Sequence, residues 1–333
     1  ITLINLQNGT FEISENGQTL REQRREDFLK YQLPFEYDPS ARCPLFDKYL
    51  QRVLPDTDCC KVLAEYMGYI FTTGLKLEKA AILYGSGANG KSVFFEVVNA
   101  LIGPDNICSY SLQNLTKYDS YQRAELSNKL LNYASEINGK LEASIFKQLV
   151  SGEPVEARQI YGRPFVMREY GKLMFNCNEL PKEVENTNAF FRRFLIIPFD
   201  SVIPESEQDP ELAAKIIRDE LSGVFNWMLE GLGRLLQQRT FTRSAIIREQ
   251  VEDFRRESDS VAMFLDEGGY KPDPQSCMLL KDLFYDYRSF CYENGYTPCS
   301  LKTVSKRLKN AGYKTERRAP GYTVYIAKSV ESM

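Results

Sequence analysis

The sequence predicts an α/β protein whose P-loop core sheet is flanked by helices, with a mostly helical module before the core and a winged helix after it. Three observations carry this prediction. A glycine-rich loop at residues 85–92 follows a strand-like run, strand-like and helical runs alternate from about residue 76 to 200, and residues 277–328 read as helix, helix and hairpin. The four predicted parts are a mostly helical module (1–75), the core (76–200), a helical lid (201–268) and the winged helix (269–333).

The first part shows apolar residues at helical spacing in two places. One stretch runs from Phe46 to Leu54, and the other from Val62 to Phe71. Prolines punctuate the segments between these stretches. We therefore expect residues 1–75 to be a small, mostly helical module.

The glycine-rich loop reads Gly-Ser-Gly-Ala-Asn-Gly-Lys-Ser and fits G-x-x-x-x-G-K-[ST], whose backbone N–H groups cradle nucleotide phosphates. The apolar run 80–84 has the length of a buried strand, and residues 93–102 continue at helical spacing. In this context Lys91 reaches the β- and γ-phosphates and the Ser92 hydroxyl holds Mg²⁺. The sequence thus predicts ATP and Mg²⁺ as cofactors. The predicted nucleotide-binding residues are Gly85, Ser86, Gly87, Ala88, Asn89, Gly90, Lys91 and Ser92.

Polar residues at the ends of two further predicted strands are candidates for the hydrolytic chemistry. A nucleoside triphosphatase needs a carboxylate beside the loop to order Mg²⁺ and the attacking water, and Glu136 follows the strand-like run 130–134. Asn178 follows the run 172–176 and could contact the γ-phosphate or the water. Asn176 competes for that role. The alternative for Asn178 is a purely structural one, because an asparagine before a proline turn is often only a turn former.

Two adjacent arginines precede the last strand-like run of the core. Arg192 and Arg193 stand among apolar residues before residues 194–199, which argues against a purely solvated role. In other systems an arginine supplied by a neighbouring subunit accelerates phosphoryl transfer by about 10³–10⁵-fold. The sequence does not decide which of the two, if either, acts in this way.

Residues 155–167 alternate as a β-hairpin does, with the tip near Arg163. Basic and aromatic residues here could follow the backbone of a single DNA strand and stack on its bases. An ordinary solvated hairpin is the alternative. The candidate single-strand contacts are Lys147, Arg158, Tyr161 and Arg163.

The predicted lid is helical. A long helix is expected from Asp209, with Pro210 in its first turn, and a solvated helix from about 248 to 264. Glycines and prolines at 268–274 then predict a linker.

The C-terminal part is basic, although the whole chain has a net charge of −3. Residues 270–333 carry 11 Lys or Arg against 6 Asp or Glu. A helix over 279–292, a second helix capped by Ser300 and a hairpin over 313–326 predict a winged helix. In the second helix, Leu301, Val304 and Leu308 are expected to face inward. The candidate DNA contacts are Lys302, Lys306 and Arg307, and a protein-docking module is the alternative.

Composition excludes several classes. The chain has no histidine, which removes His-dependent triads and His-ligated metal sites. Its 8 cysteines form no C-x-x-C pair, and no apolar run approaches the length of a membrane span, so we expect a cytoplasmic protein with reduced thiols. Because the chain begins with Ile1 rather than Met, we expect it to be either a fragment of a longer protein or a processed chain.

With these motifs in order, the chain resembles the helicase half of phage and plasmid primase–helicases, which belong to helicase superfamily 3 and are related to poxvirus-type primase–helicases. The resemblance covers almost the whole length. Beyond the glycine loop no motif is specific alone, but their order and spacing are. The matching segments are 6–10, 37–39, 66–69, 87–92, 134–136, 151–153 with Arg158, 178–181, and 192–193 with 198–199.

The resemblance implies an AAA+-like ATPase core that forms a ring, with ATP at the subunit interfaces and single-stranded DNA in the pore. It implies a homo-hexamer, 3′-to-5′ translocation, a bacterial host cell, and a primase upstream or on a separate chain. By the same resemblance, Lys91 binds phosphate, Ser92 and Glu136 serve the metal and the water, and Asn178 is the sensor. Arg192 or Arg193 is the finger from a neighbour.

The sequence therefore favours an ATP-dependent replicative DNA helicase of a phage or mobile element. One alternative is an AAA+ remodeller or loader, whose ATPase would respond to a protein partner. The other is a P-loop small-molecule kinase, which would be a monomer or dimer and leaves the basic C-terminal part and the arginine pair unexplained.

Overall fold

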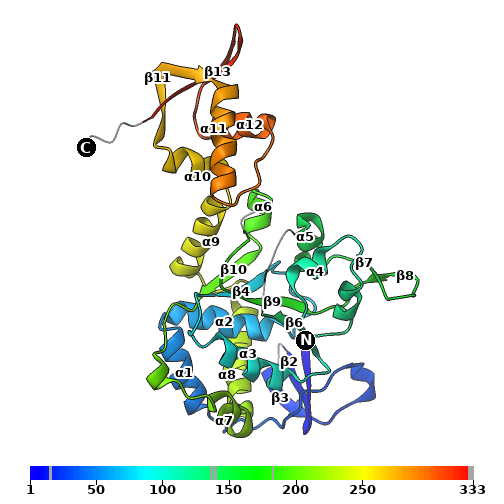
Figure 1. Ribbon diagram of the computed structural model, residues 1–333. Helices are drawn as coiled ribbons and strands as arrows, with labels where there is room; N and C mark the ends of the chain where they lie inside the picture. The colour runs from blue at the N-terminus through cyan, green and yellow to red at the C-terminus, as the bar shows by residue number, and fades with distance from the viewer. Residues whose placement is uncertain (15–16, 136, 138–140, 182–183, 329–333) are drawn as a thin grey trace. The chain divides into compact units, whose positions relative to one another are not determined.

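The structure is a computed structural model that describes residues 1–14, 17–135, 137, 141–181 and 184–328 (Figure 1). The chain separates into two compact units. One consists of Ile1–Leu180 and Thr187–Val251, and the other of Pro181–Asn186 and Glu252–Met333. Each unit has its own hydrophobic core.

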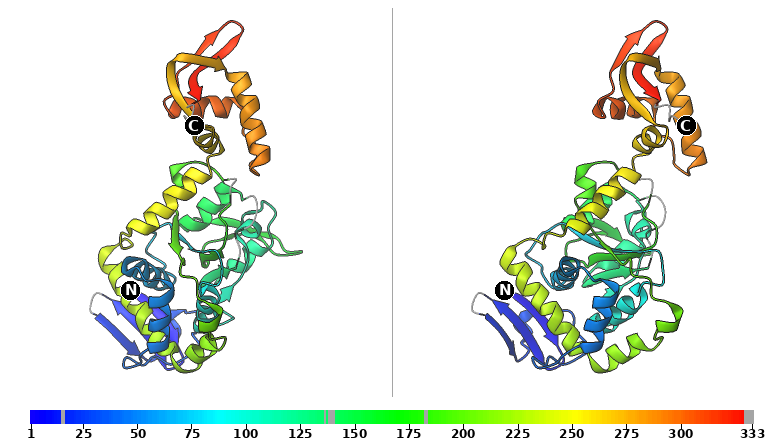
Figure 2. Two further views of the ribbon diagram at one scale, coloured as in Figure 1. Left: turned by 60° about the vertical axis from the view of Figure 1, so that its left-hand side comes forward. Right: turned by 90° about the vertical axis from the view of Figure 1, so that its left-hand side faces the viewer.

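The first unit begins with an antiparallel sheet. Strands β1 (Thr2–Leu6), β2 (Gly9–Ser14) and β3 (Gly17–Arg21) pair in that order. The prediction of a mostly helical module is wrong for this segment, because its apolar residues alternate with period two. The residues that this alternation buries are Ile4, Leu6, Phe11 and Ile13. Figure 2 shows the sheet lying along α8 (Leu221–Gln238), where the ring centroids of Phe11 and Phe225 are 6.2 Å apart.

Helices α1 (Pro44–Val53) and α2 (Thr57–Tyr69) confirm the two helices predicted from apolar spacing. They share one core with the helices that follow the central sheet and with the sheet itself. The first unit therefore packs its N-terminal segment and its later helices around the same apolar interior.

The single helix predicted from Asp209 is in fact two helices. Helix α7 covers Leu212–Asp219, and α8 starts after Glu220. At the break, the Glu220 carboxylate accepts hydrogen bonds from the backbone N–H groups of Leu45 and Phe46, each at 3.0 Å. It thus satisfies donors that the start of α1 leaves free.

The centre of this unit is a parallel sheet of five strands in the order β10-β4-β9-β6-β5 (Figure 1). The predicted strands of the core are confirmed, and the α/β class with them. The strands are β4 (Ala80–Tyr84), β5 (Ile107–Cys108), β6 (Leu131–Ala134), β9 (Lys172–Cys177) and β10 (Phe194–Pro198). Because all run in one direction, the sheet has a carboxyl edge, where the strands end, and an amino edge, where they begin.

Helices flank this sheet. They include α3 (Lys91–Ile102), α4 (Leu112–Thr116), α5 (Ala143–Ser151) and α6 (Asn188–Phe191). The predicted hairpin is confirmed: β7 (Val155–Arg158) pairs with β8 (Pro164–Met167) and projects from the unit (Figure 1). Among the described residues, the connections include three 3₁₀ turns: η1 (Arg25–Asp27), η2 (Gln122–Leu126) and η3 (Glu205–Glu207). Helix α9 covers Ala245–Glu257, and the division between the two units falls within it.

In the residues that the structure describes, the second unit contains the end of α9, three further helices and a three-stranded antiparallel sheet in the order β11-β13-β12. The second helix, its Ser300 cap and the hairpin lie where the sequence predicts them. The elements are α10 (Ser260–Glu267), β11 (Tyr270–Leu279), α11 (Leu280–Glu293), α12 (Leu301–Asn310), β12 (Thr315–Arg318) and β13 (Gly321–Lys328).

Three local predictions in this unit are wrong. The predicted helix 248–264 is interrupted at Asp259, whose carboxylate caps α10. The predicted linker 268–274 lies largely in β11, an edge strand with an irregular register between Pro272 and Cys277, where prolines are tolerated. Leu301 is 40% exposed instead of facing inward.

The contact between α2 and α8 leads to a stability prediction. A Cβ added at Gly231 would lie 2.3 Å from the backbone carbon of Ala64, so the two helices must separate to accept it. We expect Gly231→Ala to lower the free energy of unfolding by about 1–3 kcal/mol in urea titrations. Gly233→Ala on the same helix is the control, because a Cβ there would lie 3.8 Å from the side-chain nitrogen of Gln18, an ordinary van der Waals distance. Equal stabilities of the two variants would contradict the prediction.

Candidate functional site

The glycine-rich loop connects the end of β4 to the first turn of α3. Gly87, Ala88 and Gly90 have φ angles of 117°, 49° and 83°, so three loop residues adopt left-handed conformations. Gly90 is the N-cap of α3, and the N-terminus of a helix favours negative charge. The loop therefore has the strand–loop–helix geometry that suits a phosphate group.

Two of the loop glycines are required by close packing. A Cβ at Gly85 would lie 2.3 Å from the Phe199 carbonyl oxygen, and a Cβ at Gly90 would lie 2.7 Å from Val53. Tyr49 of α1 also donates a hydrogen bond to the Gly90 carbonyl at 2.7 Å. The N-terminal module thus supports the loop directly.

Lys91 is only 7% exposed, and its ammonium group is bound within the loop. Its Nζ donates to the Gly85 carbonyl at 2.6 Å and to Oδ1 of Asn89 at 2.8 Å. Burial lowers the pKa of Lys91, while Cys177 and Asp200 act in the opposite direction. The oxygens of a bound phosphate could replace these two oxygens as acceptors of the Lys91 ammonium.

The donor set around the loop fits a phosphate group. The side-chain nitrogen of Asn89 is buried and has no hydrogen-bond partner among the described residues. Together with the Lys91 ammonium and the start of α3, it makes the loop rich in donors. Ser92 lies in the first turn of α3 and is exposed, so its hydroxyl is accessible to a metal ion. Glu136, the predicted carboxylate, lies outside the described residues.

The structure separates the two candidate asparagines. Asn176 is buried, and its Oδ1 accepts a hydrogen bond from the Tyr133 hydroxyl at 2.7 Å. Asn178 is exposed, one residue after Cys177, whose carbonyl accepts from the Gly85 N–H at 3.1 Å. Asn178 therefore lies beside the loop at the carboxyl edge, whereas Asn176 has a structural contact.

The two arginines lie at the opposite, amino edge. The Ala80 N–H donates to the Arg193 carbonyl at 2.8 Å, so both arginines are next to the beginning of β4, while the loop follows its end. At about 3.3 Å per residue, the five steps from Ala80 to Gly85 correspond to about 16 Å. The pair and the glycine loop are thus at different ends of one strand.

The environments of the two arginines differ. Arg193 is 8% exposed, and its guanidinium donates to the Ser151 hydroxyl at 3.0 Å and to the Ala189 carbonyl. The Arg192 side chain is 49% exposed and pairs with Glu78. Arg192 is the arginine that can be presented to another molecule.

The hairpin β7–β8 presents its predicted contacts to solvent. Arg158 and Arg163 are exposed, and Tyr161 at the tip is fully exposed with a φ of 60°. Lys147 lies on α5 and is partly buried. The hairpin thus carries an aromatic ring and two guanidinium groups on a projecting element.

In the second unit, Lys302 and Lys306 are exposed on α12, as predicted. Arg307 differs from the other two. Its guanidinium donates to Asp259 at 2.7 Å, and the two side chains are 24% and 23% exposed. Arg307 is therefore engaged within its own unit.

Several residues near the loop and the hairpin were not found from the sequence. Asp200 follows β10 and acts on the charge of Lys91, and an acidic residue directly after a strand was a usable signal. Tyr118 is 90% exposed, and the buried Arg123 donates both to its carbonyl and to that of Glu156 in β7, which ties this loop to the hairpin. The contact between Tyr49 and Gly90 had no local signal.

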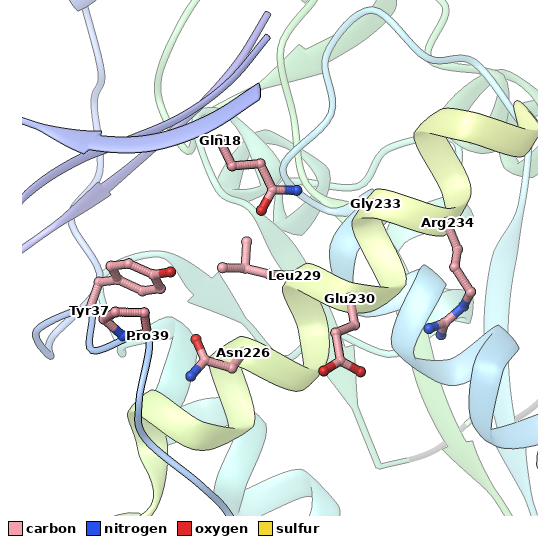
Figure 3. Close-up of a pocket in the computed structure, with 8 residues that line it drawn as sticks. All are labelled: Gln18, Tyr37, Pro39, Asn226, Leu229, Glu230, Gly233 and Arg234. Atoms are coloured by element: carbon pink, nitrogen blue, oxygen red, sulfur yellow. The ribbon is translucent and has the colours of Figure 1, made fainter. Parts of the chain in front are cut away.

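A groove of about 500 Å³ lies elsewhere in the first unit, between β3, the segment of Tyr37 and Pro39, and α8 (Figure 3). Its lining includes Asn226, Glu230 and Arg234 of α8. None of the predicted site residues lines it.

Among the described residues, no helix combines the length and apolar character needed to cross a membrane.

The contact of Tyr49 with the loop gives a second prediction. Tyr49→Phe leaves the Gly90 carbonyl without this donor. If ATP occupies the loop, as the sequence predicts, we expect its Kd to rise by about two- to ten-fold. Tyr66→Phe is the matched control, because the buried Tyr66 hydroxyl donates to the Leu173 carbonyl at 2.5 Å, away from the loop. Both variants should lose similar thermal stability, but only Tyr49→Phe should bind ATP more weakly in calorimetric titrations. Equal affinities would contradict the prediction.

Comparison with known families identifies two segments. A family described as "D5 N terminal like" matches residues 1–55, and a family of unknown function, DUF5906, matches residues 83–193. The second match spans the glycine-rich loop and both arginines.

Two viral proteins named as putative helicases are similar in sequence. The one from Invertebrate iridescent virus 3 is 24% identical over 336 residues, which cover 89% of this chain and 35% of that protein. The one from Acanthamoeba polyphaga mimivirus is 26% identical over 213 residues, covering 59% of this chain and 22% of that protein. The chain thus spans about a third or less of the length of these relatives.

Among solved structures, the apo A form of the NrS-1 C-terminal region has a similar fold. Its TM-score is 0.51 at 14% identity, with 96% of this chain and 83% of that chain covered. Similarity in sequence to viral proteins named as putative helicases, the D5-type N-terminal segment and this shared fold confirm the resemblance to the helicase half of primase–helicases.

Proposed function

We propose that this chain is the motor of an ATP-dependent DNA helicase that forms a ring and moves along single-stranded DNA. The observation that carries the proposal is the separation of two complementary half-sites on one strand. The donor-rich loop lies at the end of β4, and the exposed Arg192 lies near its beginning. A subunit of this kind completes its ATP site only by meeting a second copy head to tail, and repetition of that contact closes a ring.

In this proposal, ATP binds at the glycine-rich loop, with Lys91 and the start of α3 on the phosphates. Ser92 and Glu136 would hold Mg²⁺, which supplies charge neutralisation to phosphoryl transfer. Asn178 would sense the γ-phosphate, and Arg192 of a neighbour would complete the site. We further propose an AAA+-like, superfamily 3 core, a hexamer and 3′-to-5′ movement.

The proposed DNA contacts lie on and near the hairpin of the first unit and on α12 of the second unit. On the hairpin, the ring of Tyr161 could stack on a base, while Arg158 and Arg163 follow the phosphates. The exposed ring of Tyr118, in the loop that Arg123 ties to the hairpin, could stack on another base. Lys147 would add a further phosphate contact. In the second unit, three helices with a β-hairpin support a winged helix that binds duplex DNA through Lys302 and Lys306. Arg307 would support α12 through Asp259.

The test is steady-state ATP hydrolysis with and without single-stranded DNA, followed by unwinding of duplexes with 3′ or 5′ tails. We expect DNA to stimulate hydrolysis several-fold and the 3′-tailed duplex to be unwound. Tyr161→Ala should reduce the stimulation but leave basal hydrolysis unchanged. A hydrolysis rate that DNA does not change but a protein partner raises would favour a remodeller or loader. Phosphoryl transfer to a small molecule would favour a kinase.

A further inference from the structure

Glu78 occupies an unusual position between the two arginines of the amino edge. Its backbone has a φ of 55°, a left-handed conformation that non-glycine residues rarely adopt and that is often associated with functional sites. The next-to-last residue before β4 is therefore held in a strained conformation. The adjacent Leu77 N–H donates to the Tyr69 hydroxyl at 3.1 Å, which fixes this segment against α2.

A single oxygen of Glu78 contacts both guanidinium groups. Its Oε2 accepts from Arg192 at 2.5 Å and lies 3.3 Å from Arg193. Arg193 has additional partners, Ser151 and Ala189, and its side chain is 9% exposed. Among the described residues, the side chain that binds the Arg192 guanidinium is Glu78.

This asymmetry allows one arginine to leave while the other stays. If Arg192 moves away, Glu78 keeps the charge of Arg193 beside it and is not left as an unpaired anion. A half-exposed ion pair of this kind stabilises by only about 0–1 kcal/mol. A triphosphate carries several negative charges and can compete for Arg192 with this single carboxylate.

We propose that Glu78 is a positioning residue that holds Arg192 at rest and releases it to the nucleotide bound by a neighbouring subunit. The proposal rests on the proposed function. It predicts that Glu78 restrains hydrolysis through Arg192 until a neighbouring nucleotide competes for the guanidinium.

The first experiment measures the accessibility of Arg192 without any need for activity. The full chain is modified with phenylglyoxal, and the modification of Arg192 and Arg193 is followed by peptide mass spectrometry. We expect Glu78→Gln to raise the modification rate of Arg192 by about two- to five-fold, in line with a pair worth up to 1 kcal/mol, while Arg193 stays protected. Glu12→Gln is the control, because Glu12 pairs with Arg21 at 2.7 Å in the N-terminal sheet.

The second experiment is a double-mutant cycle on ATP hydrolysis. Glu78→Gln should raise kcat by about two- to five-fold with no matching change in thermal stability. In the Arg192→Ala background the same substitution should have no effect on kcat. A purely structural role of Glu78 would instead lower kcat and stability together in both backgrounds.

The outcomes separate this proposal from the proposed function. Unchanged modification of Arg192 in Glu78→Gln overturns the role of Glu78, whatever the ATPase does. A kcat gain that persists without Arg192 overturns it as well. If the wild-type chain hydrolyses no ATP under assembled conditions, the proposed function fails, and the modification rates still decide whether Glu78 holds Arg192.

Discussion

Lys91→Ala is expected to reduce kcat/KM for ATP by at least about a hundred-fold, the size of effect seen when one preorganised donor to a reacting group is removed. The Lys91 ammonium is buried in the loop and is held by the Gly85 carbonyl and by Asn89. Both acceptors of the ammonium are neutral, so its positive charge is available to attract a bound phosphate group.

The fold should survive this substitution. The charge of Lys91 is buried at a cost that lowers its pKa, so alanine removes an unfavourable burial together with two hydrogen bonds. We expect a thermal midpoint close to that of the wild type. Lys48→Ala, at an exposed position of α1, controls for the loss of a lysine. Retention of more than a tenth of the wild-type kcat/KM by Lys91→Ala would contradict the assigned role.

The central sheet was predictable because its signals are local. The four predicted strands are short apolar runs, and the loop carries glycine at the two positions where Phe199 and Val53 approach the backbone. The two-residue strand β5 was not predicted, because Ile107–Cys108 is too short to give a pattern. The N-terminal sheet was missed, although the dipeptide of Asn8 and Gly9 between two alternating runs is a strong hairpin signal. The helical spacing of residues 46–54 and 62–71 does not extend to residues 1–21, where the apolar residues alternate.

The parts of the site that could not be predicted depend on contacts distant in sequence. The break at Glu220 reflects capping of a helix that begins at Pro44. The difference between the two arginines depends in part on Ser151, which lies 42 residues before Arg193 and accepts a hydrogen bond from it. The sequence pattern of residues 188–199 therefore cannot show which of the two arginines binds Ser151.

Arg192→Ala and Arg193→Ala are expected to fail in different ways. Arg192→Ala should lower kcat by about 10³-fold or more, the effect of losing an arginine finger, with little change in stability because its pair with Glu78 is half exposed. Arg193→Ala should lower the free energy of unfolding by about 1–3 kcal/mol, because Ser151 and the Ala189 carbonyl lose a buried donor. Kinetics and urea titrations on the two variants distinguish these results, and a destabilised Arg192→Ala with normal kcat would reverse the assignment.

Mixing two inactive chains tests whether Arg192 acts on a neighbour. Lys91→Ala has a defective loop and an intact arginine, whereas Arg192→Ala has the reverse. In a randomly mixed head-to-tail ring, on the order of one quarter of the interfaces join an intact loop to an intact Arg192, and activity should return in proportion. If Arg192 acted on the loop of its own chain, every site in the mixture would still lack either Lys91 or Arg192. The mixture would then remain as inactive as its parts, which is the result that the distance along β4 argues against.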